Sequence, residues 1–324
     1  MSLHANFQRH VYSGFEPALA FDVVYGGTFE HRLLSSQRTT MMHQRLLLDE
    51  LRLETGCYNV PMIAMGTMPR NAVCIGLMAQ GGSSTRVNTT FVEEDEIQIY
   101  PSGIDLLYHA SASSRWINFV VPEERLQHTA ETYSGRPLDL PVDSVGWARL
   151  LPGTRASLTC LADDAMGLAA SLAPGGGPGP ELAAGIAQAL LTGYVAALSN
   201  SSAAHSSHRL STAQRHHHLI LGCERLVIGG DTSIPLEEIA RRSGYSLRSL
   251  ELIFRRCVGT TPGRWFINMR LNGALRDLIM PGQTLPVSAI ASKWGFRHLS
   301  RFSAQYRNAF GELPSDTLAR TLRA

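Results

Sequence analysis

The sequence predicts an α+β multidomain chain, with a β-rich N-terminal barrel or sandwich, a helical middle region and an all-α C-terminal domain that holds two helix-turn-helix units. Three observations predict it. Short apolar runs broken by Gly, Pro, Asn and Ser occupy residues 20–121, as in all-β domains. A long apolar segment at 181–198 follows them, and "IARRSGY" (239–245) returns as "IASKWGF" (290–296). With 324 residues the chain has room for two domains, or two plus a linker.

The N-terminal strands are predicted from six runs. They are "ALAFDVVYGG" (18–27), "HQRLLLDELRLETG" (43–56), "NAVCIGLMAQ" (71–80), "EIQIYPSG" (96–103), "IDLLYHA" (104–110) and "RWINFVV" (115–121). Large apolar side chains in and near these runs are candidates to line the inside of a barrel: Met62, Met65, Met68, Met78, Tyr100, Tyr108, Trp116 and Phe119. Methionines and aromatics also form ordinary cores, and that alternative stays open.

Four of these side chains are the predicted effector-binding residues: Met78, Tyr100, Tyr108 and Trp116. A pocket built from them would take a small, apolar or aromatic effector. Arg38, Arg86 or Arg115 is available to pair with an acidic effector, or each is a solvated surface residue.

The barrel could instead belong to an enzyme or to a plain small-molecule-binding module. Metal-binding barrels need histidines at close, alternating spacing, because several imidazoles must converge on one ion. No such spacing joins the histidines before residue 200, which are His4, His10, His31, His43, His109 and His128. No nucleophile elbow, phosphate loop or dinucleotide fingerprint is present either. We therefore predict no catalytic residue, no metal and no cofactor.

The middle region begins with a predicted helix start at 122–126. The segment 181–198 is apolar for about 17 residues, whereas a membrane span needs about 20. Gln188 and internal glycines favour a helix that is buried or that faces a partner. One face of this helix offers a dimerisation surface made of Leu182, Ile186, Leu190 and Leu198. The flanking "APGGGPGP" (173–180) and "NSSAAHSSHRLST" (200–212) are typical of a flexible loop and a linker.

Each copy of the repeat builds a helix, a glycine turn and a second helix. Pro235 and Pro286 are typical of the first turn of a helix, and Gly244 and Gly295 are typical of the position just after the C-terminal end of that helix. The two units are predicted at 236–257 and 287–308. The inward positions follow helical spacing: Leu236, Ile239, Ala240, Leu247, Leu250 and Phe254, then Val287, Ile290, Ala291, Leu299, Phe302 and Tyr306.

The outward positions of the two second helices carry side chains that can donate to base edges or phosphates in a DNA major groove. Ser246 is added because it can cap the first of these helices. The predicted DNA-binding residues are Ser246, Arg248, Ser249, Glu251, Leu252, Arg255, Arg297, His298, Ser300, Arg301, Ala304 and Gln305. A surface helix is also charged for solubility alone. The repeat of the whole helix-turn-helix pattern is therefore stronger evidence for DNA binding than any one of these residues.

Charge is divided between the two ends of the chain. Residues 206–324 hold 17 of the 29 basic and 8 of the 27 acidic residues, a net of +9, which leaves −7 for the remainder. A basic C-terminal part fits phosphate binding. Five scattered cysteines without a CxxC pair indicate free thiols in a reducing cytosol, and no signal peptide is apparent. "RHHHL" (215–219) is interpreted as part of a solvated first helix, with an ion shared by His205, His208 and His216 as the alternative.

These stretches resemble the AraC/XylS family of transcription regulators. The resemblance covers about 209–320, through "LEEIARRSGYSLRSLELIFRRCVGTTPGRWFINMRLNGA" and "VSAIASKWGFRHLSRFSAQYRNAFGELPS". It implies seven helices, with a long helix at about 262–279 that joins two units entering successive major grooves about 34 Å apart. It also implies base-reading positions at Arg248, Glu251 and Leu252, and at Ser300, Arg301 and Ala304. A looser match at 93–126 implies a cupin-like barrel around a small effector.

The predicted parts are therefore a β-rich effector-sensing domain (1–125), a helical dimerisation and linker region (126–205) and a DNA-binding domain (206–324). The predicted function is a cytoplasmic, dimeric, sequence-specific regulator, expected to be an activator, that responds to a small effector. Its expected partners are double-stranded promoter DNA, the effector, a second copy and RNA polymerase, without a membrane. The alternative is a barrel module or enzyme whose basic tail binds nucleic acid non-specifically.

Overall fold

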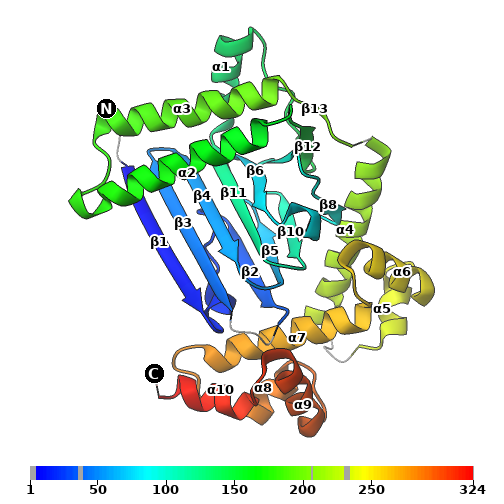
Figure 1. Cartoon of the computed structure of the whole chain (residues 1–324). Coiled ribbons are helices and arrows are strands. Elements are labelled where there is room, and N and C mark those ends of the chain that lie inside the picture. Colours follow the sequence, from blue (N-terminus) through cyan, green and yellow to red (C-terminus); the bar gives the residue numbers. More distant parts are fainter. Residues whose placement is uncertain (1–4, 36–38, 206, 230–233, 324) are drawn as a thin grey trace.

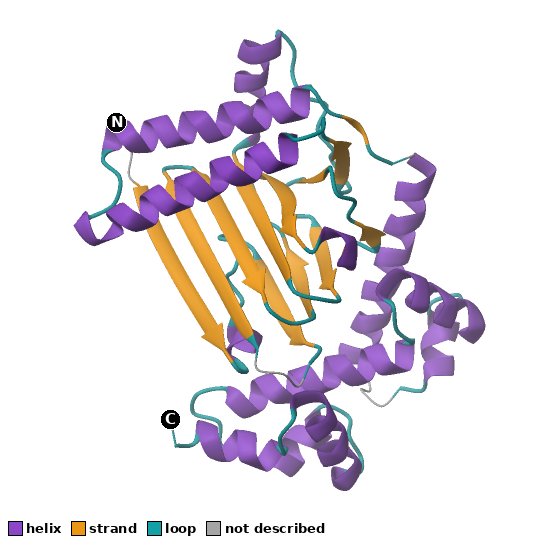
Figure 2. Cartoon of the chain, viewed as in Figure 1, coloured by secondary structure: helices purple, strands orange, loops and turns teal. Residues whose placement is uncertain are grey.

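The computed structural model describes residues 5–35, 39–205, 207–229 and 234–323. Two antiparallel sheets face each other, helices cover the outer face of the larger sheet, and a helical C-terminal part lies beyond the smaller sheet (Figures 1 and 2). The predicted fold class is confirmed, with β structure in the N-terminal part and an all-α C-terminal part.

The sheets contain all the strands of the described residues. In sheet order, the larger sheet consists of β1 (Ala5–Ser13), β3 (Thr40–Leu48), β4 (Leu51–Tyr58), β11 (Ser114–Val121), β6 (Val73–Gln80), β9 (Glu96–Tyr100), β12 (Gly146–Arg149) and β13 (Ser202–Ala203). The smaller sheet consists of β2 (Thr28–Leu33), β5 (Met62–Thr67), β10 (Asp105–Ala110), β7 (Thr85–Val87) and β8 (Thr90–Phe91). Because β12 and β13 extend the larger sheet, residues after 126 share it with the N-terminal strands.

Strand alternation separates two apolar cores in the larger sheet. On β11, Trp116 and Val120 point into the space between the sheets, whereas Ile117 and Phe119 point to the outer face. Phe119 stacks on Tyr194 with ring centroids 4.7 Å apart, so its prediction as a barrel-lining residue is wrong. Period-two alternation places it on the opposite face from Trp116.

The outer face of the larger sheet is covered by α2 (Thr154–Leu172) and α3 (Pro180–Ser199), and α1 (Glu123–Ser134) packs beside α3 (Figure 1). Ile186, Leu190 and Leu198 are buried in this core and only Leu182 is substantially exposed. The predicted dimerisation face is therefore wrong for three of its four residues, because the chain's own sheet covers it. Within the described residues, α3 alone is long and apolar enough to cross a bilayer, a test that core helices also pass, and half of its apolar window is buried.

The C-terminal part has seven helices among the described residues. They are α4 (Ser207–Ile228), α5 (Leu236–Arg242), α6 (Leu247–Val258), α7 (Pro262–Ile279), α8 (Val287–Lys293), α9 (Leu299–Phe310) and α10 (Pro314–Thr321). The long helix α7 has the bounds that the sequence predicts. Its two ends carry the pairs α5–α6 and α8–α9 (Figure 1).

The strand predictions fail mainly in two places. Residues 18–27 form no strand, because the chain turns there through Gly26, whose φ is +81°, and buries Val23 and Val24 against the barrel. The run 43–56 is a hairpin, with Asp49 at φ +59° in its turn. The strands that were not predicted are β1, β2, β5, β7, β8, β12 and β13. The predicted linker at 200–212 contains β13 and the beginning of α4.

The smaller sheet separates the barrel interior from the C-terminal helices. On β10, Leu106 and Tyr108 face the interior, whereas Leu107 belongs to a core that contains Phe254, Trp265 and other residues of α4–α7. The same sheet therefore has the barrel interior on one face and the C-terminal domain on the other.

Buried histidines should make the stability of the fold depend on pH. Burial lowers the pKa of four of them to about 4 (His31), about 3 (His43), about 4 (His109) and about 4 (His217). Each stays neutral in the folded state and gains a proton on unfolding once the pH is below its ordinary value of about 6.5. The contribution of these neutral histidines to the free energy of unfolding is therefore fully present above pH 6.5. It decreases toward pH 4, by up to about 1.4 kcal/mol per pH unit for each histidine. Urea unfolding at pH 7.5, 6.0 and 5.0 measures this, and an unchanged free energy of unfolding would contradict it.

Candidate nucleic-acid interface and ligand cavity

The first helix-turn-helix unit consists of α5 and α6. Gly244 adopts φ +78° at the turn, which favours glycine. The Ser246 hydroxyl accepts a hydrogen bond of 3.1 Å from the backbone N–H of Ser249, and so caps α6 as predicted. Leu250 and Phe254 are fully buried against the rest of the domain. This packing holds the opposite face of α6 in solvent.

The second unit repeats this arrangement with α8 and α9. Gly295 has φ +76°, and Phe302, Tyr306 and Phe310 are buried. Leu299 was predicted to point inward, but it is 46% exposed. The buried positions recur every four residues from Phe302, and Leu299 lies one turn earlier, at the first position of α9, beyond the packed core. It is a surface residue that the sequence reasoning missed.

The predicted DNA-binding residues all lie outside the core. Ten are exposed and two, Glu251 and Gln305, are half-buried. Leu252 is 47% exposed although it is apolar, a solvation cost that a partner surface would relieve. Their contact with DNA stays a prediction.

A basic cleft of about 300 Å³ lies between α7 and α9. Its polar and charged lining residues are Arg270, Arg297, His298, Arg301 and Gln305. Arg270 comes from α7, which the sequence indicated only as a connector, and its guanidinium lies 5.8 Å from the Phe296 ring centroid. The cleft gathers positive charge beside the beginning of α9, where a phosphate would be stabilised.

Gly273 on α7 sets how closely the second unit packs. A Cβ there would lie 2.2 Å from the Trp294 ring, which is fixed by a 2.8 Å hydrogen bond from its Nε1 to Asp277 Oδ2. We expect Gly273→Ala to lower the free energy of unfolding by about 1–3 kcal/mol through overpacking. Gly263→Ala on the same helix meets no atom within 4 Å and is the control. Equal unfolding free energies for the two variants would contradict this packing account.

The four predicted effector residues, Met78, Tyr100, Tyr108 and Trp116, line one cavity inside the barrel. The cavity has a volume of about 40 Å³ and lies between the two sheets. Its other lining residues are Val23, Val24, Phe29, Tyr58, Ala64, Gly76, Leu77, Val87, Gln98, Leu106 and Asn118. Met62 and Met68 are buried in the same core, whereas Met65 packs on the outer face of the smaller sheet. Ligand binding by these residues stays a prediction.

Of the arginines considered for an acidic effector, Arg86 and Arg115 do not line the cavity. Arg86 lies over the Phe91 ring at 4.0 Å, and Arg115 pairs with Asp163. Arg38 lies outside the described residues. Among the residues that line the cavity, none carries a charge.

A buried polar network joins the barrel to the C-terminal domain. Arg32 on β2 has no exposed surface and forms a two-point pair with Glu224 on α4, at 2.6 and 2.9 Å. The Trp265 Nε1 donates to the same carboxylate at 2.5 Å. Glu30 lies beside Arg32 and also pairs with Arg276 on α7 at 2.7 Å. Burial alone would raise the pKa of Glu30, but the two arginines lower it to about 2.

A side-chain amide from α7 forms hydrogen bonds with the backbone of the edge strand β2. The Asn272 side chain, fully buried on α7, accepts from the Leu33 N–H at 2.7 Å and donates to the Leu33 carbonyl at 3.1 Å. Both backbone groups of this edge position are therefore satisfied by the C-terminal domain. The contact fixes α7 to the smaller sheet.

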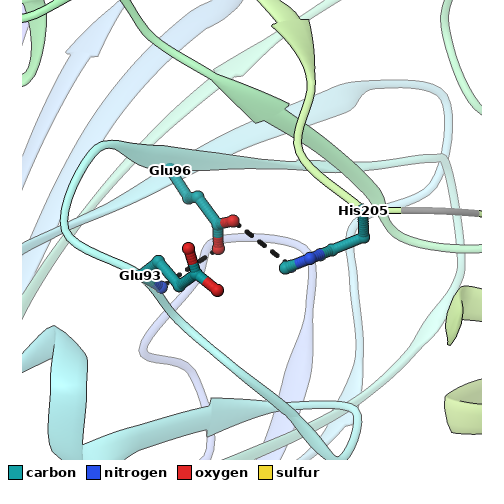
Figure 3. A group of neighbouring side chains, drawn as sticks. All are labelled: Glu93, Glu96 and His205. Carbon is teal, nitrogen blue, oxygen red and sulfur yellow. Dashed lines mark hydrogen bonds and ion pairs between the residues drawn. The ribbon is translucent and has the colours of Figure 1, made fainter.

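A second polar cluster lies where the chain enters the C-terminal domain (Figure 3). The His205 Nε2 is 3.3 Å from Glu96 Oε1, and Glu93 lies beside them. Arg149 pairs with Glu93 at 2.7 Å and Arg209 lies 3.8 Å from it. The positive charges of two guanidinium groups thus offset the negative charges of the two carboxylates. The cluster is a structural ion-pair network.

His216, also considered as a metal ligand, lies outside this cluster. The His216 Nδ1 is 3.4 Å from Cys257 Sγ, and the side chain of His208 lies outside the described residues. His217 is buried and His218 is exposed. The cysteines are free thiols, as predicted.

Comparisons with known proteins concern mainly the C-terminal part. A family model described as a helix-turn-helix domain matches residues 239–320. XylDLEGF operon transcriptional activator 2 of Pseudomonas putida is 41% identical over 88 residues, which cover 27% of this chain and 56% of that protein. XylDLEGF operon transcriptional activator of the same organism is 42% identical over 87 residues, 26% of this chain and 27% of that protein. The chain thus spans about half or less of the length of these relatives.

One solved structure is similar over most of the chain. The AraC-like transcriptional activator CuxR is 16% identical with a TM-score of 0.42, covering 80% of this chain and 99% of that chain. The stronger evidence is the family match at 239–320, which spans α6, the connecting α7 and α9 together with their glycine turns. Over this segment, the chain is similar to helix-turn-helix domains of the kind found in the XylDLEGF operon activators, which supports the resemblance to the AraC/XylS family for the C-terminal part.

Proposed function

We propose that this chain is a sequence-specific DNA-binding transcriptional regulator, expected to be an activator, that senses a small molecule in its barrel. The observation that carries the proposal is the pair of helix-turn-helix units at the two ends of α7. Each presents an exposed helix face with arginines, Arg248 and Arg255 on α6 and Arg301 on α9. Side chains of this kind read base edges in the major groove and pair with phosphates.

The smaller sheet supplies a physical route between cavity and DNA-binding domain. On β2, Phe29 lines the cavity, and the next residue, Glu30, pairs with α7. On β10, Tyr108 lines the cavity and the adjacent His109 faces Trp265, with ring centroids 6.3 Å apart. A ligand that displaces Phe29 or Tyr108 would change strands that hold α4 and α7. The regulator would then respond by a shift between two arrangements of these helices.

In this proposal each predicted part has its own function: residues 1–125 sense the effector, residues 126–205 form the helical dimerisation and linker region, and residues 206–324 bind DNA. Cytoplasmic location, homodimerisation and contact with RNA polymerase belong to the same proposal. The two Pseudomonas putida relatives are named as transcriptional activators, not as enzymes.

Competition binding tests the proposal. Purified protein is mixed with labelled genomic fragments, at physiological salt, with and without an excess of unrelated DNA. Site-specific binding should survive the competitor, because specific sites exceed non-specific ones by about 10³–10⁷ in affinity. Complete loss of binding under competition would show that the protein makes only non-specific contacts with phosphates. This result would contradict the proposal of a sequence-specific regulator.

A further inference from the structure

The floor of the barrel cavity is a short polar row on three neighbouring strands. Gly76 on β6 is paired in register with Gln98 on β9 and with Asn118 on β11. Because the position between the two amides is glycine, the Tyr100 ring and the Asn118 side chain can lie directly over the backbone there. All three residues line the cavity.

Three uncharged polar groups surround the space above Gly76. A Cβ at this position would lie 2.8 Å from Asn118 Oδ1, 2.7 Å from the Tyr100 ring and 3.4 Å from the Tyr100 hydroxyl. The Gln98 side chain is 1% exposed, and its Nε2 has no hydrogen-bond partner in the described part of the chain. A buried donor without a partner costs about 1–3 kcal/mol. A ligand atom that accepts its hydrogen bond would recover this energy.

The rest of the lining is apolar or aromatic, and none of the described residues that form it is charged. Glu54 pairs with Arg45 at 2.7 Å and stands opposite Asn118 in strand register. A carboxylate in the cavity would lose its hydration and meet no counter-ion among the described lining residues. An ammonium group would also lose its hydration without a counter-ion in the lining. Burying an unpaired ion costs far more than burying a neutral polar group.

We propose that the cavity takes an uncharged effector with an apolar, ring-sized body and one polar group, a carboxamide or hydroxyl, that accepts a hydrogen bond from Gln98. The proposal rests on the proposed sensing function and narrows its ligand class. Tyr100 and Asn118 would hold the same polar group, while Trp116, Tyr108 and Met78 would contact the body.

The cavity must widen to hold such a ligand. Its volume of about 40 Å³ is well below the roughly 150 Å³ of an apolar cavity that binds benzene. Met78 is the wall residue best suited to move, since an unbranched side chain has several accessible rotamers. Met78→Ala should therefore enlarge the cavity and strengthen binding of a ring-sized probe.

Three probes of one shape and different charge test the proposal on the full chain: benzamide, benzoate and benzylammonium. Calorimetric titration and thermal unfolding should show saturable binding of benzamide, with affinity at least about tenfold above that of either ion, a difference of about 1.4 kcal/mol. Benzoate or benzylammonium binding as tightly as benzamide would overturn the proposal. So would the absence of binding by all three to the parent chain and to Met78→Ala.

Variants locate the site and separate it from DNA binding. Gln98→Leu should weaken benzamide binding by about tenfold or more, the loss of one buried hydrogen bond. Gln80→Leu makes the same change at the exposed end of β6 and should leave binding unchanged. Gly76→Ala should displace the Tyr100 ring and the Asn118 side chain, because its Cβ would lie 2.7 and 2.8 Å from them, and should weaken benzamide binding. If Gln98→Leu binds benzamide like the parent chain, the assignment of the polar group is wrong. Competition binding to DNA is measured on the same samples. Specific DNA binding without benzamide binding would contradict the ligand proposal alone, whereas loss of specific DNA binding would contradict the proposed regulator function.

Discussion

Replacing Glu224 with alanine should lower the free energy of unfolding by about 3–5 kcal/mol, because it removes the two-point partner of the buried Arg32 and leaves this guanidinium with Glu30 alone. Arg32 has no exposed surface, and Glu224 supplies both of its 2.6 and 2.9 Å contacts from α4. The same carboxylate accepts from Trp265, so one substitution removes two contacts between the barrel and the C-terminal domain and one contact between α4 and α7. Urea unfolding of the full chain measures the loss.

The control is Glu237→Ala, which removes an exposed carboxylate from α5. Its effect should stay within about 0.5 kcal/mol, as for most surface substitutions. If Glu224→Ala is no more destabilising than Glu237→Ala, the buried pair does not hold the domains together. A second informative outcome is a transition that splits in two, since loss of the interface would uncouple the barrel from the helices.

Replacing Arg248 or Arg301 with alanine should each weaken specific DNA binding by about 1–3 kcal/mol and relax sequence preference at one half-site. Arg248 lies on α6 and Arg301 on α9, and both side chains are exposed. Because the two helices belong to different units, the relaxed base positions should differ between the variants. Selection of bound sequences from a randomised pool measures both affinity and preference.

Arg323→Ala supplies the matched control, because this arginine follows α10 and lies on neither recognition helix. It should leave the preferred sequence unchanged. If Arg248→Ala and Arg301→Ala keep the parent's preferred sequence and affinity, neither residue reads a base. A uniform loss across all sequences would instead assign the arginine to a phosphate.

The sequence predicted the C-terminal domain closely because its signals are local. Glycine turns and helical spacing recur within each unit, whereas the bounds of α7 came from the family resemblance and agree with the Thr261 cap and Pro262 at its beginning. The exception, Leu299, fails because helical spacing does not say where the packed core ends. In the N-terminal part, β1, β2, β5, β7 and β8 were missed and Phe119 was placed on the wrong face, since strand pairing depends on distant partners.

The candidate cavity was predicted in part. Aromatic and methionine side chains on β6, β9, β10 and β11 do converge, and their type alone suggested an apolar ligand. Gln98 and Asn118 could not be chosen from the sequence, because their relation depends on the register of three strands around Gly76. The pair of Arg32 with Glu224 joins residues 192 positions apart, and no local pattern predicts it.

The most direct test of the central claim is a footprint of the full chain on a selected DNA site. Two units at the ends of one helix should protect two successive major grooves on one face of the duplex, about 34 Å or one helical turn apart. Arg248→Ala and Arg301→Ala should each weaken protection of a different groove. Protection of a single groove, unchanged by either substitution, would contradict the account in which both helix-turn-helix units read DNA.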